Sequence, residues 1–241
     1  MKFIPIKSIN FSKKSRKKAD IKFLIIHYTG MQSMIASVKR LINPIHKVSC
    51  HYLIDRNGKI YQMVEDEKIA WHAGKSKWKN IKNLNSSSIG IELVNKGHRF
   101  GYQTFSKKQI NNLIKLCKIL KKKYRIKNCN ILGHSDISPL RKLDPGEKFP
   151  WKKLYKNKIG IWYTKDISKR NKNEVVNRKI REIFFKNLYI FGYRYFSLKK
   201  SLISDKLVIK SFQRRFRPKR VNGVIDKECM IISGNLAEKS R

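Results

Sequence analysis

The stretch Gly133-His134-Ser135-Asp136-Ile137-Ser138-Pro139 leads, two residues later, into Lys142-Leu143-Asp144-Pro145-Gly146. Its prolines and glycines indicate an irregular loop held by backbone constraint, which can aim side chains inward where a helix or a strand could not. His134 and Asp144 are candidate metal ligands, and Lys142 is a cation beside them. A catalytic metal site usually has three protein ligands and an open position for water, so a third ligand is required.

His27 supplies the third candidate. It follows the apolar run Phe23-Leu24-Ile25-Ile26, which is typical of a buried strand. A second apolar run, Ile89-Gly90-Ile91-Glu92-Leu93-Val94, is interrupted by one carboxylate, which is costly to bury unpaired. Taken alone, His27 could be a hydrogen-bonded core residue, and Glu92 could simply pair with a lysine.

Together these side chains fit one chemistry. His27, His134 and Asp144 could bind zinc, whose remaining position would hold a water acidified towards neutrality. Glu92 would take the proton from that water. Lys142 would lie beside the oxyanion that forms when the water attacks a carbonyl. The pattern therefore predicts metal-assisted hydrolysis of an amide or an ester.

The segments before this loop predict alternating strands and helices. Residues 33–42 have a helical pattern that ends at Asn43-Pro44. Residues 52–55 and 59–64 are expected to form a hairpin, because Asn57-Gly58 lies between them. By contrast, residues 1–20 are expected to be basic and irregular, and a polar loop is expected after Gly74, through Ser88.

A long helix and a last strand complete this part of the chain. Ser106 and Gln109 have the spacing of a capping box. After them, apolar residues at helical spacing form one face of a long helix: Ile110, Leu113, Ile114, Cys117, Leu120 and Tyr124. The strand Cys129-Asn130-Ile131-Leu132 then leads to His134. We therefore predict an α/β fold with a mixed central β-sheet flanked by helices.

The rest of the chain is predicted to form a second, smaller unit. We expect a first domain at residues 1–160, a linker at residues 161–177 and a small α-helical module at residues 178–241. The stretch 180–190 is amphipathic, and Phe212-Gln213-Arg214-Arg215-Phe216 continues the helical pattern. The helical pattern weakens after Glu228, so a final helix is not expected there.

Composition limits the possible partners. The chain has 241 residues, enough for one sizeable domain and a small one. Its formal net charge of +41 favours anionic partners such as nucleic acid, a membrane surface or an acidic polymer. Lysine, isoleucine and asparagine abound together, which also fits compositional drift in an AT-rich genome. A nucleic-acid-binding protein rests on this charge alone, because the sequence contains no DNA- or RNA-binding motif, and no specific nucleic acid is expected.

The cysteines and the N-terminal residues indicate in which cellular compartment the protein is expected. The four cysteines show no close pair and no metal-type spacing, which allows a reducing compartment. Lysine and proline interrupt the apolar residues of Met1-Lys2-Phe3-Ile4-Pro5-Ile6-Lys7. We therefore expect no signal peptide, no transmembrane segment and a cytoplasmic monomer.

Six segments, in order, carry a resemblance to a known family. They are Ile26-His27-Tyr28-Thr29, Val48-Ser49-Cys50-His51-Tyr52-Leu53-Ile54-Asp55, Ala70-Trp71-His72-Ala73-Gly74, Ser88-Ile89-Gly90-Ile91-Glu92-Leu93, Gly133-His134-Ser135-Asp136-Ile137 and Lys142-Leu143-Asp144-Pro145-Gly146. The chain resembles the zinc-dependent N-acetylmuramoyl-L-alanine amidases of the type 2 amidase family, which includes phage amidases and peptidoglycan recognition proteins.

The resemblance implies roles for particular residues. The family's zinc ligands fall on His27, His134 and Asp144, its catalytic carboxylate on Glu92 and its lysine on Lys142.

Substrate contacts are expected at His51, Trp71 and His72, in segments that the resemblance places at or near the cleft. Some phage members have a catalytic tyrosine where this chain has Cys50. A nucleophilic pair of Cys50 and His51 is the rival interpretation, which adjacent strand residues on opposite faces disfavour.

The resemblance also implies a function. The C-terminal part resembles a peptidoglycan-binding helical domain, through residues 212–216 and 222–226. The expected activity is zinc-dependent hydrolysis of the amide bond between N-acetylmuramic acid, or its 1,6-anhydro form, and L-alanine in peptidoglycan or muropeptides. The alternative is a non-catalytic peptidoglycan-recognition module on the same fold. A wall-binding module would favour the periplasm or cell envelope over the cytoplasm.

Overall fold

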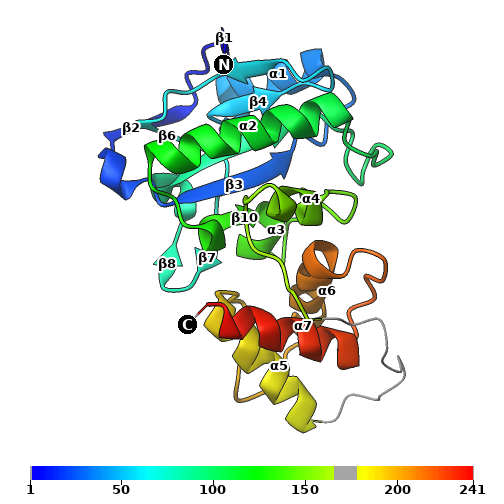
Figure 1. Ribbon diagram of the computed structural model, residues 1–241. Coiled ribbons are helices and arrows are strands. Elements are labelled where there is room, and N and C mark those ends of the chain that lie inside the picture. The colour runs from blue at the N-terminus through cyan, green and yellow to red at the C-terminus, as the bar shows by residue number, and fades with distance from the viewer. Residues whose placement is uncertain (1, 166–177, 241) are drawn as a thin grey trace.

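A mixed sheet forms the centre of the computed structural model, which describes residues 2–165 and 178–240 (Figure 1). Within residues 2–165 the sheet has six strands in the order β1-β5-β4-β9-β3-β10. Their bounds are Ile4–Pro5 (β1), Phe23–Tyr28 (β3), Tyr52–Ile54 (β4), Ile60–Gln62 (β5), Ser88–Leu93 (β9) and Ile131–Gly133 (β10). The predicted mixed central sheet is confirmed.

The centre of the sheet is parallel and buried. Strand β3 pairs in parallel with β9 on one side and with β10 on the other. Its residues Phe23 to His27 are buried, as are all residues of β9. Parallel strands covered on both faces are expected to be almost continuously apolar. His27 and Glu92 interrupt that pattern, which indicates that this part of the sheet has a role other than packing the core.

Two short ribbons lie beside the main sheet and were missed by the sequence patterns. Strand β2 (Phe11–Ser15) pairs antiparallel with β6 (Lys68–Ala70), and β7 (Lys77–Trp78) pairs with β8 (Ile81–Lys82). The prediction that residues 1–20 are irregular is therefore wrong, since they contain β1 and β2. Strands β2, β6, β7 and β8 are short and each contains lysine, so they lack the apolar alternation that indicates a strand.

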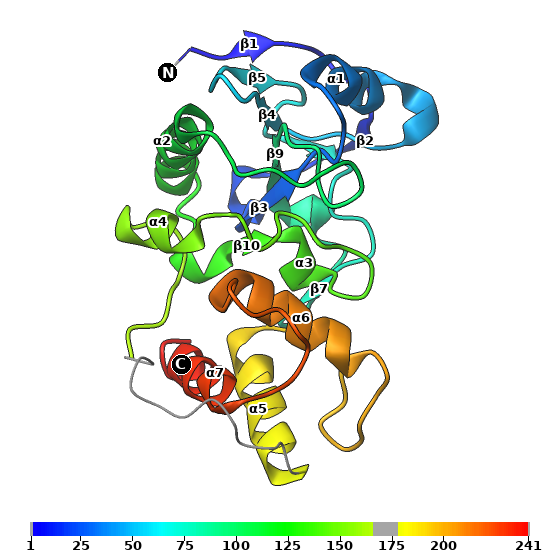
Figure 2. The ribbon, with the colours of Figure 1, turned by 90° about the vertical axis from the view of Figure 1, so that its right-hand side faces the viewer.

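Helices cover both faces of the sheet (Figure 2). The predicted helices are confirmed as α1 (Met34–Ile42) and α2 (Lys107–Lys123). In β4, Tyr52 and Ile54 share the large core cluster with the apolar face of α2, whereas Leu53 belongs to a second cluster with residues of α1. The alternation of side chains along β4 thus provides a surface for each helix.

The cap of α2 is only half of the predicted capping box. Ser106 Oγ accepts a hydrogen bond from Gln109 N at 3.0 Å, as predicted. Gln109 does not return the bond, because its Nε2 donates to Ile54 O at 2.9 Å and to Val94 O at 3.2 Å. Its side chain therefore joins the helix to the sheet instead of closing the cap.

The remaining helices lie beyond the β10 edge of the sheet (Figures 1 and 2). They are α3 (His134–Ile137), α4 (Trp151–Lys156), α5 (Arg178–Phe191), α6 (Asp205–Phe216) and α7 (Lys227–Glu238). The expectation that no final helix follows Glu228 is wrong. Asp226 caps α7 by accepting from Cys229 N at 3.0 Å, and Ile232 and Leu236 are buried along it. Within the described ranges, no helix has the length and apolar character needed to cross a membrane.

The C-terminal helices pack directly onto the first part of the chain. One apolar cluster contains buried residues from both, and the Trp78 ring lies edge-on to Phe191 at 5.5 Å and to Tyr193 at 5.0 Å between ring centroids. Tyr193 OH also donates to Asp136 Oδ1 at 2.5 Å. Residues 166–177 of the predicted linker lie outside the described residues, and the boundary near residue 160 stays a prediction.

Candidate active site

The neighbouring parallel strands β9, β3 and β10 bring the predicted residues together at their carboxyl ends. The register pairs His27 of β3 with Glu92 of β9. Gly133 of β10 pairs with Ile26, so His134, the next residue, lies level with His27. Side chains at one register position of neighbouring strands point to the same face. In open α/β sheets ligands bind outside the carboxyl ends of the strands, which is where these residues lie.

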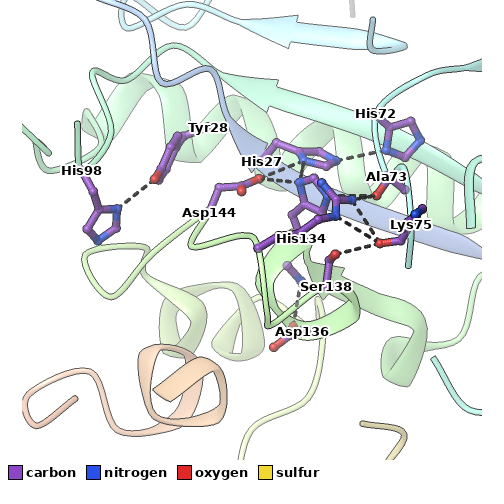
Figure 3. Close-up of polar contacts among 12 residues, drawn as sticks. His27, Tyr28, His72, Ala73, Lys75, His98, His134, Asp136, Ser138 and Asp144 are labelled. Carbon is purple, nitrogen blue, oxygen red and sulfur yellow. Dashed lines mark hydrogen bonds and ion pairs between the residues drawn. The ribbon is translucent and has the colours of Figure 1, made fainter. Parts of the chain in front are cut away.

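His27, His134 and Asp144 form a compact buried cluster (Figure 3). His27 Nδ1 lies 2.9 Å from His134 Nδ1 and 3.0 Å from Asp144 Oδ2, and His134 Nδ1 lies 3.0 Å from that same oxygen. Asp144 reaches this position because its loop returns beside α3, where Ser135 N donates to Asp144 O at 2.8 Å. The three side chains predicted as metal ligands therefore converge on one point.

The protonation of His134 and Asp144 suits a divalent cation. His134 Nε2 lies 3.1 Å from Ala73 O and 3.3 Å from Arg141 Nη2. Arg141 Nη2 donates to Ala73 O and Lys75 O, so the Nε2 proton of His134 is directed to Ala73 O, which only accepts. A neutral imidazole protonated at Nε2 carries a lone pair at Nδ1, the atom that faces Asp144. Burial alone would raise the pKa of Asp144, but its contacts with His134 and His27 outweigh burial and hold the pKa well below its usual range.

A lone pair and an ionised carboxylate oxygen therefore face each other, which a cation between them satisfies. Imidazole nitrogen and carboxylate oxygen are common ligands of divalent metals. His27 contributes a second neutral imidazole, because burial in the protein interior lowers its pKa to about 4. The cluster thus fits a divalent metal ion.

Glu92 stands beside the cluster with an unsatisfied oxygen. Its side chain is 8% exposed, and Oε2 is buried with no hydrogen-bond partner among residues 2–165 and 178–240. Burial, followed by the charge of Asp144, raises the pKa of Glu92 to about 8, and Lys142 opposes this shift. Within these two ranges no ion pair within 4.0 Å joins Glu92 to a lysine. Glu92 is therefore available to a ligand.

A cleft of about 690 Å³ gives access to the cluster. This volume is in the range of sites for small organic ligands. Its lining includes Glu92, His134, Asp144 and four cationic side chains, namely Arg40, Arg99, Arg141 and Lys142. A metal-binding cluster, a carboxyl group of raised pKa and a lysine in one cleft can together activate a water and stabilise negative charge on a carbonyl oxygen.

The three predicted substrate contacts lie in different surroundings. His72 lines the cleft, but its Nδ1 lies 3.1 Å from His27 Nε2, on the side of His27 that faces away from the ligand cluster (Figure 3). His51 is fully buried, and its Nδ1 accepts from Gly90 N at 3.0 Å. Trp71 is half-buried, and the structure does not place it among the residues that line the cleft.

His98 and Tyr28 are cleft residues that the sequence patterns did not single out. Tyr28 OH lies 2.8 Å from His98 Nδ1 (Figure 3). His98 Nε2 lies 3.1 Å from Glu147 Oε2. The His98 ring stacks on Tyr102 with 4.4 Å between ring centroids. His98 is an exposed residue that lines the cleft, and its neighbours in the chain give no signal of a site. Tyr28 follows the ligand His27 at the end of β3, which was the one available signal.

The rival nucleophilic pair finds no support. Burial, followed by the charge of Glu92, raises the pKa of the Cys50 thiol well above its usual value. Cys50 Sγ contacts Met63 Sδ at 3.7 Å, and the His51 ring is hydrogen-bonded elsewhere. A nucleophilic cysteine needs a lowered pKa and access to the substrate, and this residue has neither.

Comparison with known proteins identifies the family of the chain. Residues 17–147 match the family described as N-acetylmuramoyl-L-alanine amidase. The chain is 36% identical over 234 residues to the N-acetylmuramoyl-L-alanine amidase AmiD of Escherichia coli K12, which covers 91% of this chain and 83% of that protein. It is 34% identical over 166 residues to the 1,6-anhydro-N-acetylmuramyl-L-alanine amidase AmpD of Haemophilus influenzae, covering 61% of this chain and 88% of that one.

Solved structures agree over almost the whole chain, including the C-terminal helices. E. coli AmiD, in complex with anhydro-N-acetylmuramic acid-L-Ala-D-γ-Glu-L-Lys, matches with a TM-score of 0.80 at 33% identity, covering 95% of this chain and 92% of that one. Pseudomonas aeruginosa AmpDh3, in complex with an anhydromuramic pentapeptide, matches with a TM-score of 0.81 at 32% identity, covering 95% and 94%. The chain belongs to the N-acetylmuramoyl-L-alanine amidase family.

Proposed function

We propose that this protein is a zinc-dependent amidase that hydrolyses the bond between 1,6-anhydro-N-acetylmuramic acid and L-alanine in peptidoglycan fragments. The observation that carries the proposal is the position of Glu92, one strand away from His27 and in register with it, beside the ligand cluster. Two relatives of similar structure hold anhydromuramyl peptides, which supports this class of substrate.

The proposed metal is zinc, held by His27, His134 and Asp144. When bound, it supplies Lewis-acid chemistry, which polarises a carbonyl and lowers the pKa of a water. Two imidazoles and one carboxylate are a ligand set that catalytic zinc sites use, with one position left open.

Glu92 is the proposed general base and acid. As a carboxylate it receives a proton from the water that attacks the amide carbon, and its buried oxygen is free to do so. Burial favours the neutral acid that results, which can then give the proton to the leaving nitrogen of L-alanine. Positive charge nearby works the other way: Lys142 lowers the pKa of Glu92, and a dication in the cluster would add to this. The carboxylate is thereby accessible near neutral pH.

Lys142 is the proposed partner of the developing oxyanion. It lies in the cleft with Glu92 and Asp144. A cation fixed next to a carbonyl oxygen stabilises the negative charge that grows there during attack. A binding role alone would need neither this lysine nor a buried base beside three ligands, which favours the enzyme over a recognition module.

Mass spectrometry of the reaction products tests the proposal. The purified chain is incubated with a soluble 1,6-anhydro-muropeptide and, separately, with intact sacculi. We expect free peptide with an L-alanine N-terminus from the soluble substrate, loss of activity after chelation, and recovery on adding Zn²⁺. Uncleaved muropeptide, or full activity after the metal has been removed, would refute the proposal. The cytoplasmic location and the monomeric state stay predictions.

A further inference from the structure

We propose that His72 is a positioning residue for the metal site, because it holds His27 in the tautomer whose Nδ1 lone pair faces His134 and Asp144. The proposal rests on the proposed function, in that it concerns the same metal cluster. It gives His72 a role in addition to the predicted contact with substrate, which stays a prediction.

A chain of hydrogen bonds fixes the direction of each proton. Ser88 Oγ donates its hydroxyl proton to Leu84 O at 2.6 Å. That hydroxyl can then only accept from the His72 ring, whose Nε2 lies 3.2 Å away. His72 therefore carries its proton at Nε2 and a lone pair at Nδ1.

The lone pair of His72 in turn determines which nitrogen of His27 carries the proton. His72 Nδ1 lies 3.1 Å from His27 Nε2, so the lone pair of His72 accepts the Nε2 proton of His27 (Figure 3). His27 is then left with a lone pair at Nδ1, the atom that lies 3.0 Å from Asp144 Oδ2. A ligating histidine needs this tautomer, and the partner of its other nitrogen sets it.

The His72 ring packs closely against the backbone of β9. A Cβ on Gly90 would lie 2.4 Å from His72 Cγ, so the ring rests on the bare backbone of β9 and requires glycine there. Asn85 Oδ1 accepts from His72 N at 3.1 Å and from Ala73 N at 2.7 Å, which fixes the backbone of the segment. Ala73 O in turn accepts from the other ligand, His134. One short segment thus positions both histidine ligands.

Two substitutions with the same number of side-chain heavy atoms separate the hydrogen bond from packing. In His72→Asn the amide oxygen falls near the position of Nδ1 and can still accept from His27, whereas His72→Leu fills similar space without an acceptor. Zn²⁺ affinity of the full chain is measured by competition with a chromophoric chelator. We expect His72→Leu to bind Zn²⁺ about 10- to 100-fold more weakly, the usual effect of losing such a partner, and His72→Asn to stay close to wild type.

A second readout needs no metal. The ¹⁵N shifts of the His27 ring in metal-free protein report its tautomer: Nε2–H in wild type and His72→Asn, and a mixture in His72→Leu. Equal Zn²⁺ affinity in all three proteins, equal loss in both variants, or an unchanged tautomer in His72→Leu would overturn the proposal. If His72→Leu fails to fold, Ser88→Ala carries the test, because it removes the acceptor that orients His72 and should weaken Zn²⁺ binding in the same direction. Cleavage of muropeptide enters none of these measurements, so failure of the proposed function is seen separately.

Discussion

The buried ion pair between Arg215 of α6 and Asp136 of α3 tests whether the C-terminal helices belong to the catalytic fold. Arg215 Nη1 donates to Asp136 Oδ2, and the two side chains are 2% and 1% exposed. Arg215 Nη2 donates to Ile131 O at 3.0 Å, and the guanidinium lies 4.3 Å from the centroid of the Trp151 ring. Arg215→Met keeps the length of the side chain and much of its packing, but it leaves Asp136 as a buried charge without its cation.

The structure sets the expected size of the effect. Removing one partner of a buried pair costs about 3–5 kcal/mol, because the remaining charge is uncompensated. Asp136 keeps hydrogen bonds from Gly133 N at 2.8 Å and from Tyr193 OH at 2.5 Å, so we expect the lower end of that range. For a chain of this size about 1 kcal/mol lowers Tm by about 2–4 °C, which predicts a decrease of about 6–12 °C for Arg215→Met.

Calorimetry and circular dichroism of the full chain measure this decrease. As a control, Lys165→Met removes a pair with Glu238 whose side chains are 52% and 59% exposed, which should cost at most about 1 kcal/mol. Adding Asp136→Asn to Arg215→Met should recover part of the loss, since no charge is then stranded. The reasoning is refuted if Arg215→Met melts like the control, or if it melts in two steps of which one keeps the wild-type Tm.

Three further predictions concern the cleft. Glu92→Gln should keep its bound metal and lose about 10²- to 10⁴-fold in kcat, because the shape remains and the base is gone; metal analysis and steady-state kinetics check this, and near-normal turnover contradicts it. Lys142→Ala should lower kcat by about 10²- to 10³-fold, and an unchanged kcat in the same assay would end the oxyanion assignment. In metal-free protein, the pKa of Glu92 is raised from 4.5 to about 8, so the unfolded chain releases this proton first and stability falls as pH rises through that window. The slope is at most about 1.4 kcal/mol per pH unit. Urea titrations at several pH values should therefore show the free energy of unfolding of Glu92→Gln increasing relative to that of wild type as pH rises. A difference that stays constant with pH would contradict the raised pKa.

The cluster of His27, His134 and Asp144 could be predicted because each of its residues stands in a recognisable local context. His27 ends an apolar run, and His134 and Asp144 lie ten residues apart in one loop rich in proline and glycine. Apolar runs also indicate strands buried on both faces, and a carboxylate within one of them is conspicuous. For these reasons Glu92 could be singled out before its position beside His27 was known.

Contacts between distant segments could not be predicted in the same way. The partner of His27 Nε2 is His72, 45 residues later, and the partner of Asp136 is Arg215, 79 residues later. No periodicity encodes which side chains meet across two elements, so neither the contact of His72 with His27 nor the packing of the C-terminal helices on the first part of the chain was predicted. His98 was overlooked for the same reason, since its partner Tyr28 lies 70 residues away.

The separation of the three ligands along the chain also determines when a metal ion can be captured during synthesis. His27 and Asp144 are 117 residues apart, and His134 takes its place only when β10 has paired with β3. A nascent chain therefore offers isolated histidines until the ribosome has passed Asp144 and the parallel centre of the sheet has closed, a step that is slow because its contacts are non-local. Binding of a metal ion at this cluster would then be a late event in biogenesis, and the ion would stabilise a sheet that has already formed.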